Sequence, residues 1–106
     1  MKKKNLLITG GSTRIGREIA LHFAKKGWNI IIHYFKSSSE ANILKKTIEK
    51  NKIKVILIKA DLKNRKQVEN IFYLAKKKLG KIDCLVNNAA LFEKDDILNF
   101  TSKNWD

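Results

Sequence analysis

The residues best suited to chemistry lie in a turn between an apolar segment and an amphipathic one. They are Gly10, Ser12, Arg14, Ile15 and Gly16. Gly10 permits a tight turn that a Cβ would obstruct. The first N–H groups of a following helix lack partners and lie at the positive end of the helix dipole, so they attract anions such as a pyrophosphate. We therefore predict that this turn binds a nucleotide cofactor and is more than a plain strand-to-helix connection.

A second group of polar side chains follows the second apolar run and includes Tyr34, Lys36 and Ser37. A site for NAD usually places an Asp or Glu here to hold the ribose hydroxyls, and this segment has neither. Lys36 and Arg14 carry charges that suit the 2′-phosphate of NADP, since charge-assisted hydrogen bonds contribute about 1.5–3 kcal/mol each. The missing acid is the stronger argument for NADP(H), because Lys is common in this chain and Lys36 could be a solvated surface residue.

Two further polar segments follow apolar runs. Asp61-Leu62 follows the third run, and Asn87-Asn88-Ala89 follows the fourth. Asp61 either accepts a hydrogen bond from an adenine amino group or ends the strand as a turn residue. The small and amide side chains of the fourth segment suit the close approach of a cofactor, and an Asn-rich turn is the alternative.

Strand-like and helix-like patterns alternate along the chain, with short connections between them. A continuous apolar run such as Ile30 to Ile32 is typical of a strand buried on both faces. Alternation of this kind predicts an α/β fold with a parallel sheet and helices on both faces. The predicted strands are Asn5–Thr9, Asn29–Tyr34, Lys54–Lys59 and Cys84–Asn87, and the predicted helices are Ile15–Lys26, Ser37–Asn51 and Asn64–Leu79, with the first turn of another at Thr101–Asp106.

Local signals add detail to these helices. Ser37 and Glu40 have the spacing of a capping box. Gly27 and Gly80 are expected to end the first and third helices. Ile15 is assigned to the apolar side of the first helix.

Three motifs taken together resemble the short-chain dehydrogenase/reductase family. They are Thr9-Gly10-x-x-x-Arg14-Ile15-Gly16 for the cofactor loop, Asp61-Leu62 for the adenine side, and Asn87-Asn88-Ala89-Ala90 for the segment usually written NNAG. Their order and spacing are those of the family. The resemblance covers essentially the whole chain but only the first half of the family's domain. It implies a Rossmann-type sheet, an adenine contact for Asp61, and hydride transfer between a nicotinamide cofactor and a carbonyl or imine.

Arg14 departs from the usual loop, in which a second glycine stands at this position. The substitution is similar to the pteridine-reductase-like branch, as are segment 33–37 and the aromatic Phe92. In that branch Phe92 would stack on a flat pterin ring, so it is the expected substrate residue. Ala90 stands where the family usually has Gly or Ser, so no hydroxyl contact to the cofactor is expected there.

Members of this family use a Ser and a Y-x-x-x-K pair that follow the NNAG motif. Tyr73 and Lys77 match the spacing but precede Asn87, and we interpret them as a chance match. His22 and His33 have no catalytic partner pattern and are read as structural. We therefore expect residues 1–106 to be a partial Rossmann domain, cut before the catalytic segment and inactive alone. It would be a fragment, a degraded gene product, or half of a split enzyme completed by another chain. The partners expected besides the cofactor are a complementing C-terminal half or a second copy in a homo-oligomer.

The formal net charge of +13 comes from 23 basic residues, of which only three are Arg. It permits nucleic-acid binding, but no nucleic-acid motif accompanies it, which favours solvated lysines. The single Cys84 excludes an internal disulfide and, with two separated His, argues against zinc. No stretch is long enough to span a membrane, so the expected location is the cytoplasm. Two alternatives stay open, a non-catalytic nucleotide-binding or interaction module and a basic nucleic-acid binder.

Overall fold

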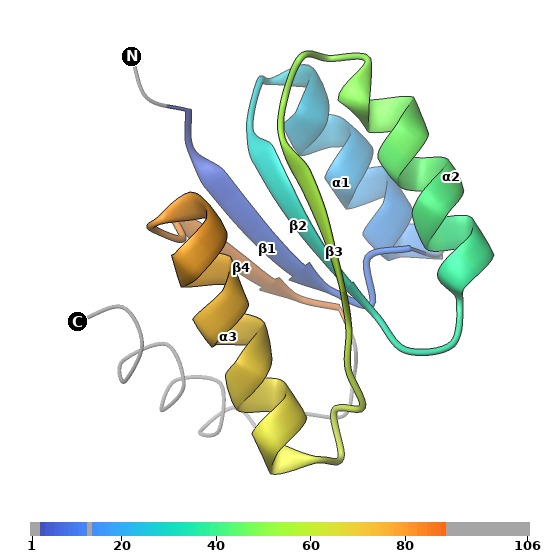
Figure 1. The fold of residues 1–106 in the computed structure, drawn as a ribbon. Coiled ribbons are helices and arrows are strands. Elements are labelled where there is room, and N and C mark those ends of the chain that lie inside the picture. Colours follow the sequence, from blue (N-terminus) through green and yellow to red (C-terminus); the bar gives the residue numbers. More distant parts are fainter. Residues whose placement is uncertain (1–2, 13, 89–106) are drawn as a thin grey trace.

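Strands and helices alternate along residues 3–12 and 14–88, which are the residues that the structure, a computed structural model, describes. Figure 1 shows one sheet with helices on both faces, so the predicted α/β, Rossmann-type class is confirmed. The predicted turn at 101–106 lies outside the described residues. The elements are β1 (Asn5–Thr9), α1 (Arg14–Lys25), β2 (Asn29–Tyr34), α2 (Ser38–Glu49), β3 (Val55–Lys59), α3 (Arg65–Leu79) and β4 (Cys84–Asn87).

The described strands form a parallel sheet in the order β3-β2-β1-β4. Leu6 pairs with Ile30 on one side and with Cys84 on the other, so β1 lies in the middle. All strands end at the same side, which we call the carboxyl edge, and start at the opposite amino edge. The chain adds β2 and β3 on one side of β1 and β4 on the other. Such a switch point is where open α/β sheets bind ligands, outside the carboxyl ends of the strands.

Each face of the sheet has its own apolar core. Helices α1 and α2 cover one face, where Leu6 and Ile8 pack with Ala20 and Leu44. Helix α3 covers the other face, where Leu7 packs with Phe72. Successive residues of β1 therefore point into different cores, and both cores exclude water. This double burial is the reason why the central strands read as continuous apolar runs rather than alternating ones.

The predicted element bounds are correct to within two residues, but two local predictions are wrong. Ile15 is 68% exposed and is not part of the core of α1. The side chain of Ser37 makes no capping hydrogen bond, so the capping box with Glu40 does not form. The backbone of Ser37, at φ −90° and ψ 54°, lies outside the extended region that an N-cap usually adopts. Gly80, at φ 85°, ends α3 as predicted.

Candidate cofactor-binding site

The loop from β1 to α1 packs so closely against the first turn of α1 that Gly11 in the loop and Gly16 in the helix have no room for a side chain. A Cβ on Gly16 would lie 2.4 Å from the Gly10 carbonyl oxygen and 2.7 Å from the Asn88 side-chain nitrogen. A Cβ on Gly11 would lie 2.7 Å from the Ile8 side chain. Gly10 itself adopts φ 62°, in the left-handed region that favours glycine. The loop thus brings glycine backbone close to the start of α1. In any helix the first N–H groups have no backbone partner one turn earlier.

His33 on β2 holds this loop in place. Its ring is 2% exposed, its Nδ1 accepts the Gly10 N–H at 3.0 Å, and its Nε2 donates to the Ala60 carbonyl at 2.8 Å. Only the neutral ring with its proton on Nε2 can make both bonds. Burial lowers the pKa of His33 below 6.5, against the opposing effect of the bond to Ala60. Sequence reasoning treated this residue as structural, and a lone histidine in an apolar strand was the signal for its place beside the loop.

The carboxyl ends of β1 and β4 are joined by side-chain hydrogen bonds. The Thr9 hydroxyl donates to Asn87 Oδ1 at 3.0 Å and accepts the Asn88 N–H at 3.2 Å. The Asn88 side chain donates to the Gly10 carbonyl at 3.0 Å. These bonds bring the predicted residues of the first and fourth segments together at the switch point, although they are about 80 positions apart in the sequence. Ala89 and Phe92 lie outside the described residues.

Arg14 begins α1 in an unusual conformation. Its φ is 43°, in the left-handed region, which costs a residue with a Cβ about 1–2 kcal/mol. The conformation explains why a glycine suits this position. Arg14 and Ile15 are both exposed beside the loop, whereas Ser12 is 3% exposed. An exposed cation at the positive end of a helix is favourable only where an anion is close.

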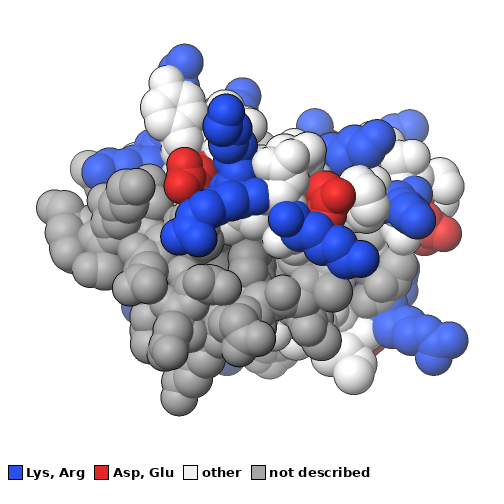
Figure 2. Space-filling model, turned by 90° about the horizontal axis from the view of Figure 1, so that it is seen from below, with Lys and Arg blue, Asp and Glu red and all other residues white. Residues whose placement is uncertain are grey.

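The end of β2 carries the segment that the sequence assigned to cofactor choice. Tyr34 and Ser37 are half-buried, and Lys36 is exposed with its Nζ 5.7 Å from the centre of the Phe35 ring. No acidic residue stands between positions 34 and 37. Figure 2, which looks from below at the carboxyl edge, shows Lys and Arg side chains dominating the charged groups on the described part of this face.

Asp61 and Leu62 lie where β3 passes into α3. The Asp61 carboxylate accepts the Lys63 N–H at 2.9 Å, and its own N–H donates to the Gln67 side chain at 2.8 Å. These bonds are those of a turn residue, the second of the two readings, and the adenine contact stays a prediction. Leu62 is 8% exposed and its side chain belongs to the core under α3. Asp61 directly follows Ala60, so His33 links this turn to the glycine loop.

Two other kinds of site find no support in the described part of the chain. Residues 3–12 and 14–88 contain no cluster of three His, Cys, Asp or Glu side chains that could hold a metal ion. Tyr73 is 57% exposed on α3, and Lys77 lies over its ring at 5.8 Å. This contact on the outer face of a helix agrees with the reading of the pair as a chance match.

No described helix is both long and apolar enough to cross a lipid bilayer.

Comparison with known proteins matches residues 4–106 to the family model described as short chain dehydrogenase. An oxidoreductase of Bacillus subtilis, YhdF, is 38% identical over 104 residues, which are 97% of this chain and 36% of that protein. The 3-oxoacyl-[acyl-carrier-protein] reductase FabG of Staphylococcus epidermidis is 29% identical over 97% of this chain and 42% of its own length. This chain therefore spans about two fifths of the length of these relatives. A dehydrogenase structure from Burkholderia cenocepacia with bound NADP matches with a TM-score of 0.75 at 31% identity, over 80% of this chain and 33% of that chain.

Proposed function

Because this chain belongs to the short-chain dehydrogenase family, we propose that it is the NADP(H)-binding part of an oxidoreductase. The observation that carries the proposal is the loop in which Gly16 leaves no space for a Cβ against the Gly10 carbonyl. Such packing lets a pyrophosphate approach backbone N–H groups at the start of α1. When bound, the nicotinamide cofactor supplies or accepts a hydride.

The residues of the carboxyl edge divide the binding task. The N–H groups at the start of α1 would hold the pyrophosphate, with Ser12, Ile15 and Gly16 around it. Asp61 and Leu62 would lie on the adenine side. Asn87, Asn88 and Ala89 would line the nicotinamide side. The bonds from Thr9 to Asn87 and Asn88 support this division, because they tie the carboxyl ends of β1 and β4 together before any ligand binds.

Preference for NADP(H) is the finer part of the proposal. Lys36 and Arg14 are exposed at the end of β2 and the start of α1, and positions 34–37 hold no carboxylate that would repel a 2′-phosphate. Arg14 is kept in a left-handed conformation that glycine would adopt without strain. Strain of this kind is tolerated where a side chain has a task. NADP bound to the Burkholderia relative is consistent with this preference.

A charge reversal tests the preference directly. Lys36→Asp should raise the Kd for NADPH at least about tenfold and leave the Kd for NADH nearly unchanged, since only NADPH carries the phosphate. Fluorescence titration of the chain with each cofactor measures both values. Lys46→Asp, the same charge change at an exposed residue of α2, is the matched control. Equal weakening of NADPH and NADH by Lys36→Asp contradicts recognition of the 2′-phosphate.

The substrate side of the proposal follows the pteridine-reductase-like pattern of Arg14, segment 33–37 and Phe92. The family's Ser and Y-x-x-x-K set is expected beyond Asn88, and no such pair follows Asn88 in the 106 residues. We therefore expect the chain alone to bind NADPH without oxidising it when a pterin or a quinone is added. Loss of absorbance at the NADPH band would overturn this part.

A completing C-terminal half and a cytoplasmic location remain predictions. The family match favours neither the interaction module nor the nucleic-acid binder.

A further inference from the structure

The amino edge of the sheet, opposite to the glycine loop, surrounds a hollow of about 890 Å³. Twelve described residues line it, and half of them are lysines, although lysine makes up only about one fifth of the chain. The lysines come from the start of β1, from the link between α2 and β3, and from the end of α3 and the turn after it. They are Lys3, Lys4, Lys52, Lys54, Lys78 and Lys81.

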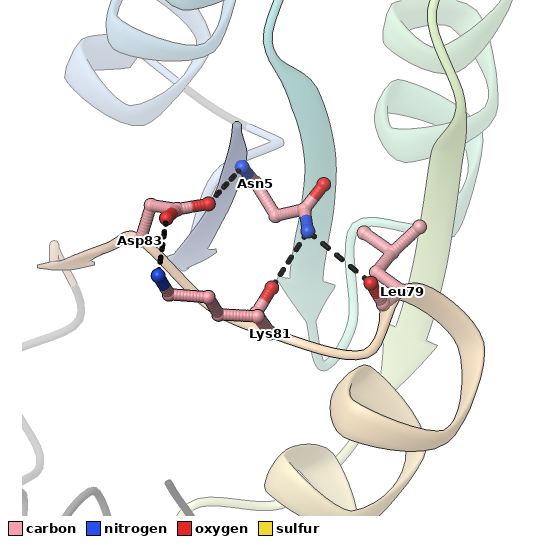
Figure 3. Close-up of polar contacts among 4 residues, drawn as sticks. All are labelled: Asn5, Leu79, Lys81 and Asp83. Carbon is pink, nitrogen blue, oxygen red and sulfur yellow. Dashed lines mark hydrogen bonds and ion pairs between the residues drawn. The ribbon is translucent and has the colours of Figure 1, made fainter. Parts of the chain in front are cut away.

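One carboxylate, that of Asp83, lines the hollow with them, and its oxygens are already engaged. Figure 3 shows that Asp83 Oδ2 accepts the Asn5 N–H at 2.8 Å and that Oδ1 lies 3.6 Å from Lys81 Nζ. Six lysines against one aspartate leave a formal charge of +5 on the lining residues. Like charges around one space repel one another, and a bound anion would relieve the repulsion.

The side-chain amides of Asn5, which is buried, and Asn29, which is half-buried, hold the lysine-bearing segments in fixed positions. Asn5 Nδ2 donates to the carbonyls of Leu79 at 3.3 Å and Lys81 at 2.7 Å (Figure 3). Asn5 Oδ1 accepts a hydrogen bond from the Asn29 side chain, and Asn29 Oδ1 accepts the Lys54 N–H, both at 2.9 Å. The backbone that carries Lys54 and Lys81 is thereby tied to β1. Ligand binding would not need to order these segments, which lowers its entropic cost.

A simpler role exists for part of this charge. Helices α2 and α3 end at the amino edge, and cations there complement the negative ends of the helix dipoles. Lys78 lies in the last turn of α3 and fits that role. Lys3, Lys4 and Lys54 lie outside the helices, so dipoles do not account for the whole group.

We propose that this hollow binds a small anion that carries two or more phosphate groups. A single exposed lysine contributes little to such a contact, so useful affinity requires several lysines to act on one ligand. The lysines surround one space, as a compact multivalent anion requires, and the volume lies in the range of ligand pockets. The lining residues include no aromatic side chain on which bases could stack, which disfavours a single-stranded nucleic acid. The site is separate from the cofactor loop and does not rest on the proposed cofactor.

Inorganic tripolyphosphate is the probe for the test, measured by calorimetric titration of the full chain. The variant Lys52→Gln/Lys54→Gln/Lys81→Gln should weaken binding about tenfold, a loss of about 1.4 kcal/mol shared among three contacts. The control Lys25→Gln/Lys46→Gln/Lys76→Gln removes the same charge from exposed helix residues that do not line the hollow. It should weaken binding less than about twofold.

With tripolyphosphate as the probe, three results would overturn the proposal: no measurable binding, equal weakening by the two triple variants, or loss of binding when NADPH saturates the chain. The third would assign the anion to the glycine loop instead. Circular dichroism of each variant checks that it is folded, and Lys54→Gln alone gives a milder change if a triple variant is not. A double-stranded oligonucleotide that binds more tightly than tripolyphosphate, with the same loss in the hollow variant, would indicate nucleic acid and also contradict the proposal.

Discussion

The two edges of this sheet use different chemistry, although the same strands form both. At the carboxyl edge, glycines bring backbone close to the start of α1, and the side chains of His33 and Asn88 each form one hydrogen bond with the backbone of Gly10. At the amino edge, the amide of Asn5 ties β1 to the turn after α3, and lysines surround a hollow. One edge is built around closely packed glycine backbone, and the other around long charged side chains.

This difference has a physical cause. Helices α1 and α3 follow the carboxyl ends of strands, so the positive ends of their dipoles lie at that edge. Their negative ends lie at the amino edge, where cations are favourable. Parallel topology therefore makes the carboxyl edge a place for anions held by backbone, and the amino edge a place where anions need side chains.

The largest expected effect is at the carboxyl edge. Gly16→Ala should destabilise the chain by about 3 kcal/mol and abolish NADPH binding, because the new Cβ would lie 2.4 Å from a backbone oxygen. Chemical denaturation and cofactor titration measure the two effects. The control is Gly27→Ala in the turn before β2, where φ is 86° but nothing lies within 4 Å of a new Cβ. That variant should lose only about 1 kcal/mol and keep its affinity. Equal losses in the two variants would refute the role of close packing.

The next largest effect is expected at the amino edge. Asn5→Ala removes three side-chain hydrogen bonds, to Leu79, Lys81 and Asn29, and should destabilise the chain by about 2 kcal/mol. Asn5→Asp, which keeps the acceptor for Asn29, is the comparison variant. The Kd of the folded protein for NADPH should be unchanged, since Asn5 lies at the far end of β1 from the glycine loop. A change in this Kd would show that the two edges are coupled.

His33 is expected to make stability depend on pH. Because burial lowers its pKa in the folded chain, the unfolded chain binds the proton first as pH falls below about 6.5. The contribution of His33 is therefore complete above pH 6.5 and is lost as pH falls toward the lowered pKa, by at most about 1.4 kcal/mol per pH unit. Denaturation of the native chain and of His33→Asn between pH 5 and about 7.5 measures the difference. Equal slopes in the two proteins would contradict it.

Two substitutions at His33 test the two hydrogen bonds of its ring separately. The amide of His33→Asn can reach Gly10, as Nδ1 does, whereas that of His33→Gln can reach Ala60, as Nε2 does. If the bond to the loop positions the cofactor, His33→Asn should keep NADPH affinity and His33→Gln should lose about tenfold. The opposite order would assign the effect to the turn at Asp61.

The smallest expected effects are those of replacing Arg14 by glycine, which should raise the stability of the chain and lower its affinity for the cofactor. Arg14→Gly should stabilise the chain by about 1 kcal/mol, because glycine adopts φ 43° without strain. The same variant should weaken NADPH several-fold, as a charged contact is lost. Arg14→Ala keeps the strain and loses the charge, so it should weaken binding without the gain in stability. A gain in both properties would mean that Arg14 has no task at the cofactor.

The sequence alone determined the order of elements, the α/β class and the family motifs. Apolar runs and their spacing indicate which faces of a strand or helix are buried, because side chains repeat with a fixed period within each element. The two wrong predictions concern residues whose side chains fit more than one structural role. Ile15 fits the apolar period of α1 but is exposed at its start, and Ser37 fits a cap but has the wrong backbone.

Only the tertiary structure decided which distant groups meet. Nothing local in the sequence joins His33 to Gly10, Asn88 to Gly10, or Asn5 to Lys81, since strand pairing creates each contact. The left-handed φ of Arg14 and the gathering of lysines at the amino edge also became visible only in the fold. The period of apolar residues determines which way a side chain faces. The candidate sites at both edges depend instead on which strand ends the sheet brings together.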